Sequence, residues 1–450
     1  MRRVTIAEMT KAALAVSLIL SLAGCSQGQF ASPSGTGLPI DGSAGPTGSA
    51  GPIASRSPGA STPAEESVPP IESGELVVWA SEPVARALKP FADRFATDQG
   101  VTVTVEAFSE DLVPSFLTAS NAGASPDLIA APHQDLGQLL ADGAIQPITD
   151  GTGEGFDPIA MRALTSGGQP YGIPYSMENL GLIIDTDLAA TCPATMEELV
   201  ATGKALVKAD KASDILALQV GPNGDAFHLY PLFASGGGSL FGTTPSGDPD
   251  PAAVTVDDRA SIAAGKRIAS LGAKGAKALK TSIDQATAIP SFFGRQTAFL
   301  VSGPWAVPDI AKAAVPMAVC PIPPWEGGSP AGPLVNVNAF FLASHGQSPT
   351  LARQFLESVL AGSDAQLAMA GAESRRPALL AAQPAFAAAQ PVIASFAAAA
   401  AGGIPVPPIP EMREVWGPLG AAEVKIIDGG NVEKALRAAA TAIRDGITRQ

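Results

Sequence analysis

The segment from residue 75 to residue 130 alternates between strand-like and helix-like patterns, and this alternation constrains the fold more than any other feature. Runs rich in β-branched and aromatic residues predict strands, and the stretch after the first run has apolar residues near helical spacing at Val84, Leu88, Phe91 and Phe95. The order is strand, helix, strand, helix, strand at residues 75–79, 83–97, 101–105, 115–120 and 126–130. This order predicts an α/β fold with parallel strands covered by helices.

A second buried-strand pattern, at residues 297–301, runs directly into the turn residues Gly303 and Pro304. Such a strand stops abruptly and presents Trp305 at its carboxyl end. A flat ring in that position is a natural wall for a ligand crevice. The alternative is that Trp305 is simply a core residue.

The size and charge of the chain limit its organisation and its partners. With 450 residues, the chain is longer than a single hydrophobic core usually organises, so two lobes or domains are expected. Its formal net charge is −14, and no basic stripe is present. Nucleic acid is therefore excluded as an expected partner.

The first 73 residues read as an export signal followed by a tether. Arg2 and Arg3 precede an apolar run at residues 12–23 that is too short to span a bilayer comfortably. The sequence Leu-Ala-Gly-Cys ending at Cys25 resembles a lipobox, which implies that Cys25 is lipidated; the alternative is an ordinary thiol after a cleavage site. Residues 26–73 are rich in Gly, Ser and Pro, so a disordered linker is expected there.

Several segments resemble, in the same order, the extracellular solute-binding proteins of sugar ABC importers. They are the strand-turn-tryptophan segment at 296–310, the helix start at 195–200 with Thr195 and Glu198 in capping-box spacing, and the proline-rich run at 404–416 that ends in Trp416. The resemblance covers roughly residues 74–450.

This resemblance implies a two-lobed periplasmic-binding-protein-like fold of type II, each lobe a sheet flanked by helices. Lobe 1 would comprise 74–176 and 340–388, lobe 2 would comprise 181–334 and 392–450, and hinges would lie near 177–180, 335–339 and 389–391. The function it implies is binding of a maltose- or trehalose-type disaccharide, a maltodextrin or a related oligosaccharide, with delivery to a membrane permease. The protein would act as a monomer outside the cytoplasmic membrane, held there by its lipid alone.

The resemblance also assigns residues to a sugar site. Tryptophans in the positions of Trp305 and Trp416 stack on sugar rings, and a glutamate in the position of Glu178 accepts bonds from ligand hydroxyls. Weaker candidates share a position close to the expected cleft, and each could instead have a structural role: Asp225, Phe227, Asn338 and Arg375.

Other contacts of the family do not carry over, because residues of a different kind stand at the matching positions. With 5% aromatic residues, an extended maltodextrin groove is doubtful, so a smaller sugar or a different disaccharide is an equal expectation. Four residues at strand ends are candidates to replace the missing contacts: Trp79, Glu82, Gln134 and Asp135.

The remaining chemistry is limited. Cys192 and Cys320 form either a disulfide or two free thiols, and the resemblance places both in one lobe. No metal or cofactor site is expected, because His133, His228 and His345 lie far apart in sequence.

Two alternative functions remain open: a secreted glycan-active hydrolase, since paired carboxylates near aromatics also describe glycosidases, and a binding protein for a non-sugar solute. No catalytic residue is predicted.

Overall fold

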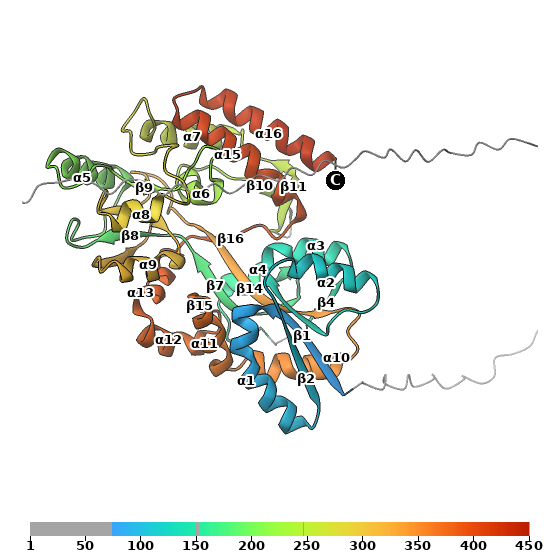
Figure 1. The fold of residues 1–450 in the computed structure, drawn as a ribbon. Coiled ribbons are helices and arrows are strands. Elements are labelled where there is room, and N and C mark those ends of the chain that lie inside the picture. Colours follow the sequence, from blue (N-terminus) through green and yellow to red (C-terminus); the bar gives the residue numbers. More distant parts are fainter. Residues whose placement is uncertain (1–73, 149–152, 246, 450) are drawn as a thin grey trace, which may run out of the picture. The chain divides into compact units, whose positions relative to one another are not determined.

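The computed structural model of the protein describes residues 74–148, 153–245 and 247–449 (Figure 1). The predicted signal peptide, the lipidation site at Cys25 and the linker at 26–73 lie outside the described residues. The folded part is built on two sheets, and each sheet has a hydrophobic core of its own.

The first sheet is mixed, with the strand order β15-β7-β14-β3-β1-β2 and with β4 and β16 paired to β14. The opening strands behave as predicted, since β1 pairs in parallel with both β2 and β3. The later strand β14 runs antiparallel to β3 and β7. The strands are β1 (Glu75–Ser81), β2 (Thr102–Phe108), β3 (Leu128–Pro132), β4 (Ile145–Gln146), β7 (Gly172–Asn179), β14 (Leu334–Ala343), β15 (Arg376–Pro377) and β16 (Ile404–Pro405).

Helices pack against this sheet, and the sequence of the first helix explains where it begins, where it ends and which face is buried. Helix α1 (Glu82–Gln99) has a proline in its first turn, where no backbone donor is needed, and ends at Gly100 with φ of 68°. Its buried face includes Val84, Leu88 and Phe95, as the spacing predicts. The others are α2 (Leu112–Asn121), α3 (Leu136–Ala141), α4 (Pro158–Ala163), α10 (Pro349–Phe355), a π-helical turn (Leu356–Leu360) and α11 (Ser363–Ala372).

The second sheet has the order β13-β8-β12-β9. Its strands are short, and the strand predicted at 216–220 is reduced to two residues because only these pair with β12. The strands are β8 (Gly181–Asp185), β9 (Ala217–Leu218), β12 (Phe299–Ser302) and β13 (Met317–Cys320); separate hairpins are β5 (Thr165–Ser166) with β6 (Gln169–Pro170), and β10 (Phe241–Thr243) with β11 (Pro249–Val254).

Helices α7, α15 and α16 pack on one another beside this sheet (Figure 1). The predicted capping box opens α5, since Thr195 accepts a bond from the Glu198 backbone and the Glu198 carboxylate accepts one from Ala194. The helices are α5 (Met196–Lys208), α6 (Ala226–Ser235), α7 (Arg259–Leu271), α8 (Ala288–Phe293), α9 (Val307–Lys312), α12 (Gln383–Ala389), α13 (Pro391–Ala394), α14 (Phe396–Ala399), α15 (Arg413–Ile427) and α16 (Val432–Thr448). Among the described residues, no helix combines the length and the apolar character that crossing a bilayer requires.

The chain passes between the two cores at single residues. Strand β7 ends at Asn179, Leu180 belongs to the second core, and β8 then begins at Gly181. In β14, Leu334 belongs to the second core and Val335 to the first. At both crossings, a strand of the first sheet is therefore joined to the second core by a single residue or none.

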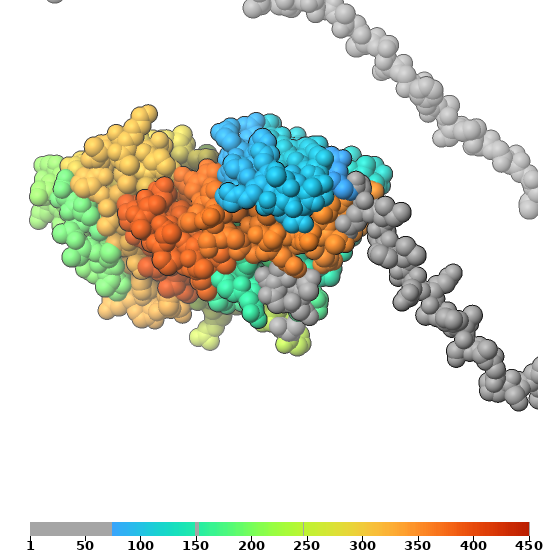
Figure 2. All heavy atoms as spheres, turned by 90° about the horizontal axis from the view of Figure 1, so that it is seen from below, coloured from blue at the N-terminus to red at the C-terminus, as the bar shows by residue number. Residues whose placement is uncertain are grey.

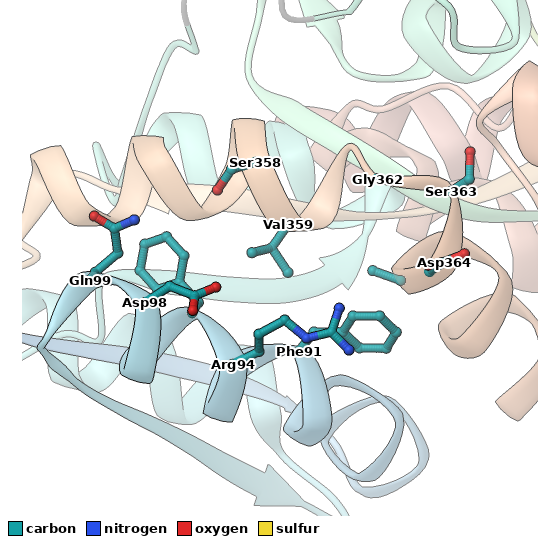
Figure 3. A pocket seen from close by; sticks show the side chains of 11 residues that line it. Phe91, Arg94, Asp98, Gln99, Ser358, Val359, Gly362, Ser363 and Asp364 are labelled. Atoms are coloured by element: carbon teal, nitrogen blue, oxygen red, sulfur yellow. The ribbon is translucent and has the colours of Figure 1, made fainter.

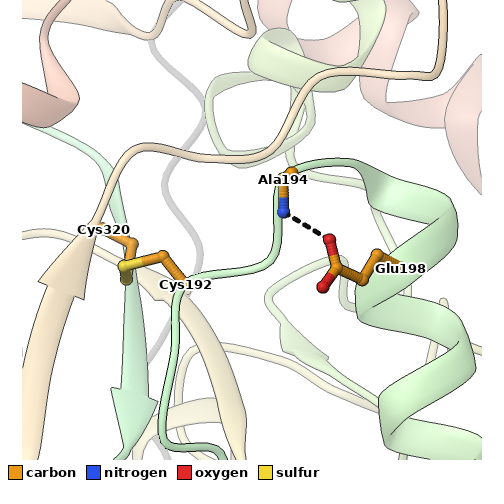
Figure 4. Close-up of a disulfide and its surroundings, with 4 residues drawn as sticks. All are labelled: Cys192, Ala194, Glu198 and Cys320. Atoms are coloured by element: carbon orange, nitrogen blue, oxygen red, sulfur yellow. Dashed lines mark hydrogen bonds between the residues drawn. A yellow bond between two sulfur atoms is a disulfide. The ribbon is translucent and has the colours of Figure 1, made fainter.

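A disulfide joins Cys192 to Cys320 within the second sheet region (Figure 4). It links the loop before α5 to the end of β13, and the two cysteines are 128 positions apart in sequence. The loop it closes contains β9, α6 and β12, which carry much of the second core.

We expect the double variant C192A/C320A to lose stability, because an open loop of this length gives the unfolded chain much more freedom. The loss should be about 2 to 5 kcal/mol in the free energy of unfolding, measured by urea denaturation. Wild-type protein treated with a reductant should match the variant. Equal stability of oxidised and reduced wild-type protein would contradict this expectation.

His133 ties the first sheet to the segment that follows β16. Its side chain is fully buried. Its Nδ1 accepts a bond from the Val337 backbone at 3.1 Å, and its Nε2 lies 2.9 Å from the Val406 carbonyl oxygen, so Nε2 carries the proton. Burial lowers the pKa of His133 from 6.5 to about 4, although both backbone bonds act in the opposite direction.

A histidine with a lowered pKa binds fewer protons in the folded state than in the unfolded state, so stability should fall as pH falls from about 6.5 toward 4. Between pH 7 and pH 5 we expect His133 to account for a loss of about 2 kcal/mol, measured by urea denaturation at both pH values. The variant H133Q should lose this part of the pH dependence. The exposed His345 provides the control, and H345Q should behave like wild type.

Candidate functional site

Strand register brings several polar side chains to one edge of the first sheet. Asn338 of β14 lies opposite Pro132 at the end of β3 and opposite Ser176 of β7. β1 runs parallel to β3 with Trp79 opposite Ile129, and it ends at Ser81, directly before Glu82 at the start of α1. The predicted candidates at these strand ends therefore belong to a common edge.

A three-residue ion cluster, Glu178–Arg375–Glu373, lies at this edge. The Arg375 Nε donates to Glu178 Oε2 at 2.7 Å, and its Nη1 lies 2.9 Å from Glu373 Oε2. A second bond, from Nη2 to Glu178 Oε1 at 3.3 Å, makes the first pair bidentate. The side chains are between 11% and 26% exposed, so the cluster is mostly shielded but reaches solvent.

Neutral polar side chains extend the cluster across the sheet. Asn336 donates to Glu178 at 3.4 Å, and Gln134 donates to Asn336 at 2.7 Å. On the other side, Asn338 donates to both Ser176 and Glu373, each at 3.2 Å. A continuous network thus runs from the end of β3 to the residues just before β15.

Burial and charge act against one another in this network. Burial lowers the pKa of Arg375, but the charges of Glu178 and Glu373 raise it by more, so the net shift is upward. Burial, and then the Glu373 charge, raise the pKa of Tyr175, which lies beneath the network. Arg375 therefore stays charged at any pH at which the protein is folded.

Trp305 projects from the second sheet. Ser302 at the end of β12 pairs with Gly181 at the start of β8, three positions after Glu178. Trp305 lies one turn beyond Ser302, and 39% of its surface is exposed, which is unusual for so large an apolar residue. The predicted alternative of a core tryptophan does not describe this exposed ring.

The Trp305 ring folds back over Gly303. A Cβ added at Gly303 would collide with three atoms of the indole, so glycine is required if the ring is to keep this position. The ring also stands edge-to-face with His228, at 6.2 Å between centroids.

The turn before α6 carries Asp225 and Phe227. Asp225 caps the helix by accepting a bond from the His228 backbone at 3.0 Å, and its second oxygen lies 2.9 Å from His228 Nδ1. Burial raises the pKa of Asp225, but the bonds with His228 and Gln219 outweigh it and lower the pKa overall. Phe227 is partly buried against the second core.

Trp416 lies in the first turn of α15 and is likewise partly buried against the second core. Further along the same helix, Gly420 touches the backbone of Gly224, immediately before Asp225. Gly224 has φ of 79°, and an added Cβ would collide with Gly420, so both glycines are needed for this approach. The contact fixes the position of Asp225 relative to the helix that carries Trp416.

Three other predicted candidates, Trp79, Glu82 and Asp135, make none of the hydrogen bonds or ring contacts described above. Trp79 stacks against Phe108 of β2 with ring centroids 4.7 Å apart, and Glu82 is exposed at the start of α1. Asp135 is adjacent to Gln134, and burial raises its pKa.

Sequence reasoning missed two acidic residues. Glu373 lies in no helical or strand pattern, so the sequence does not indicate its partners. The only available signal was that Glu373 is two residues before Arg375. Glu423 is 3% exposed, its Oε2 has no hydrogen-bond partner, and burial followed by the Asp225 charge raises its pKa well above the usual value. Only tertiary contacts bring Glu373 to Asn338 and bring Glu423 near Asp225.

Three cavities have linings that include none of these candidate residues. One of about 650 Å³ is lined by α4, the β10–β11 hairpin and the prolines at 405–408. Another, of about 400 Å³, separates α1 from the π-helical turn and α11, where Phe91, Arg94 and Asp98 face Val359 and Asp364 (Figure 3). The third, of about 320 Å³, includes Asp214 and Lys280. Figure 2 shows α1 lying along the orange segment that contains α10 and α11.

Within residues 74–148, 153–245 and 247–449, no three histidine, cysteine or acidic side chains are grouped as a metal site would require. What the edge offers instead is a set of hydrogen-bonding groups on the first sheet and exposed or partly exposed rings on the second. Such a combination suits a ligand with both hydroxyl groups and apolar faces.

Comparison with known proteins establishes the class. The fold is that of a two-lobed periplasmic-binding-protein-like protein: a cyclo/maltodextrin-binding protein, crystallised with maltotetraose, superposes with a TM-score of 0.76 and 26% identity over 85% of this chain and 99% of the other. The chain belongs to the bacterial extracellular solute-binding protein family, whose model matches residues 91–397. The family and the fold expected from the sequence are thus confirmed.

Similar proteins of known function are also solute-binding proteins. The maltodextrin-binding protein MdxE of Bacillus subtilis strain 168 is 25% identical over 377 residues, which cover 81% of this chain and 87% of MdxE. A galactooligosaccharide-binding protein of the same strain is 21% identical over 375 residues, or 80% and 86% of the two chains. These relatives are sugar-binding proteins rather than enzymes.

We expect G303A to displace the Trp305 indole, because the added methyl group and the ring cannot occupy the same space. Acrylamide quenching of tryptophan fluorescence and a crystal structure of the variant would show the change. The matched control is G417A beside Trp416, where an added Cβ meets no atom within 4 Å. An unmoved Trp305 ring in the G303A crystal structure would contradict the expectation.

Proposed function

We propose that this protein is the substrate-binding component of an ABC importer for a maltose-type disaccharide or a maltooligosaccharide. It captures the sugar between its two lobes and delivers it to a permease without altering it chemically. The observation that carries the proposal is the pairing of an exposed indole, Trp305, with the Glu178–Arg375–Glu373 network at the ends of the two sheets.

The chemistry of a sugar matches these two surfaces. The C–H faces of a pyranose ring pack on aromatic rings, and its hydroxyl groups donate to carboxylate and amide oxygens. Trp305, Trp416 and Phe227 would provide the rings, and Glu178, Asn338 and Asp225 would provide the acceptors. That similar proteins bind maltodextrin or galactooligosaccharide supports a carbohydrate ligand.

Capture would depend on movement at the chain passes. We place the hinges at 177–180, 335–339 and 389–391, with the lobe borders expected from the sequence. Hinge closure around a ligand is a general property of binding proteins of this class. A lipid on Cys25 and the segment at 26–73 would hold the protein at the outer face of the membrane, near its permease.

A glycan-active hydrolase is less well supported. Glycosidases need two carboxyl groups on either side of the scissile bond, one of them able to donate a proton. Here Glu178 and Glu373 are both bonded to one guanidinium. Glu423, whose Oε2 has no hydrogen-bond partner, is only 3% exposed, so burial shields it from a ligand.

We expect W305A and W416A each to weaken binding of maltotriose by about 1 kcal/mol or more, measured by isothermal titration calorimetry. The control is W79A, which removes a ring that stacks on Phe108 and should reduce stability without changing affinity. Unchanged affinity in both site variants would remove the site assignment. Release of glucose from maltotriose by the wild-type protein would contradict the binding function itself.

A further inference from the structure

The network at the edge of the first sheet uses most of its own donors internally. All three nitrogens of the Arg375 guanidinium contact Glu178 or Glu373. The amide nitrogens of Asn336 and Asn338 also donate to members of the network. Glu178 Oε2 accepts one bond and Glu373 Oε2 accepts three, so Glu178 Oε2 and Glu373 Oε1 keep acceptor capacity for a ligand, while Nη1 and Nη2 of Arg375 each keep one N–H.

The network also carries an excess of negative charge, because one guanidinium faces two carboxylates. The neighbouring Arg376 does not correct this excess, since its side chain is 5% exposed and turns to Asp157 at 3.2 Å. His133 adds no charge near neutral pH because burial lowers its pKa to about 4.

We propose that the Glu178–Arg375–Glu373 cluster selects the ligand by charge: the site accepts uncharged or cationic sugars and rejects sugars that carry a carboxylate or phosphate. This inference rests on the carbohydrate binding proposed above and specifies which sugars qualify. Arg375 acts in it as a positioning residue that fixes two acceptors, and not as a group that binds the ligand.

Hydrogen bonding and electrostatics act in the same direction here. Hydroxyl and ammonium groups donate to the free lone pairs of Glu178 and Glu373. A carboxylate or phosphate on the ligand brings further acceptors and a like charge, and the partly buried position weakens screening by solvent. Placing like charges together is an effective way to exclude a wrong ligand.

The test uses three forms of one trisaccharide that differ at a single carbon. Maltotriose is compared with derivatives whose terminal C6 hydroxyl is replaced by an amine or oxidised to a carboxylate, with affinities measured by calorimetry at low salt. We expect the carboxylate form to bind at least about tenfold more weakly than maltotriose, and the amine form to bind at least as well as maltotriose. The difference should shrink at high salt.

Two variants assign the effect to the cluster. Both E178Q and E373Q remove one negative charge while keeping nearly the same shape, so each should reduce the discrimination against the carboxylate form by about threefold or more. The control E433Q makes the same charge change on α16, where Glu433 pairs with Arg437, and should leave the discrimination unchanged. Thermal unfolding verifies that each variant is folded, and either folded cluster variant is sufficient for the test.

The outcomes separate the two proposals. Equal affinity for all three wild-type ligands would overturn charge selection and leave carbohydrate binding intact. Discrimination that persists unchanged in both E178Q and E373Q would also overturn it. Failure of all three ligands to bind the wild-type protein would overturn the charge selection together with the proposed maltooligosaccharide ligand.

Discussion

The ion cluster around Arg375 is the interaction on which the arrangement of the site depends. Two carboxylates at about one-tenth exposure lie beside one guanidinium, and its bonds to both offset the cost of burying them together. The cluster joins β7 to the residues before β15, and Asn336 and Asn338 connect it to β14. Without the arginine, the acceptors proposed for the ligand would repel one another.

Much of the fold could be predicted because its signals are local. The periodicity of α1, its first-turn proline and its terminal glycine lie within one stretch of chain, and so does the capping box of α5. The turn that exposes Trp305 was also readable, since a strand followed by Gly303 and Pro304 must stop there. By contrast, the strand at 216–220 was overestimated, because pairing with β12 and not propensity decides its length.

The candidate site residues remain predictions, and the sequence indicated only some of the contacts that the structure shows among them. Glu178 was named through the family resemblance, and Trp305 through its place at a strand end together with that resemblance. In the structure Ser302, three residues before Trp305, pairs with Gly181, three residues after Glu178. The role of Arg375 was not readable, because its two partners come from different segments and one of them, Glu373, has no pattern of its own. Trp79 remains a predicted contact, and what the structure adds is that its ring lies against Phe108 of the neighbouring strand.

The contact between Gly224 and Gly420 has a consequence for how proteins of this design can diverge. With no side chain between them, the backbone before Asp225 lies directly against the helix that carries Trp416. A longer or shorter sugar could not be accommodated by sliding one wall away from the other. New ligand preferences would have to arise by exchanging the side chains mounted on these two segments, while the two glycines stay in place.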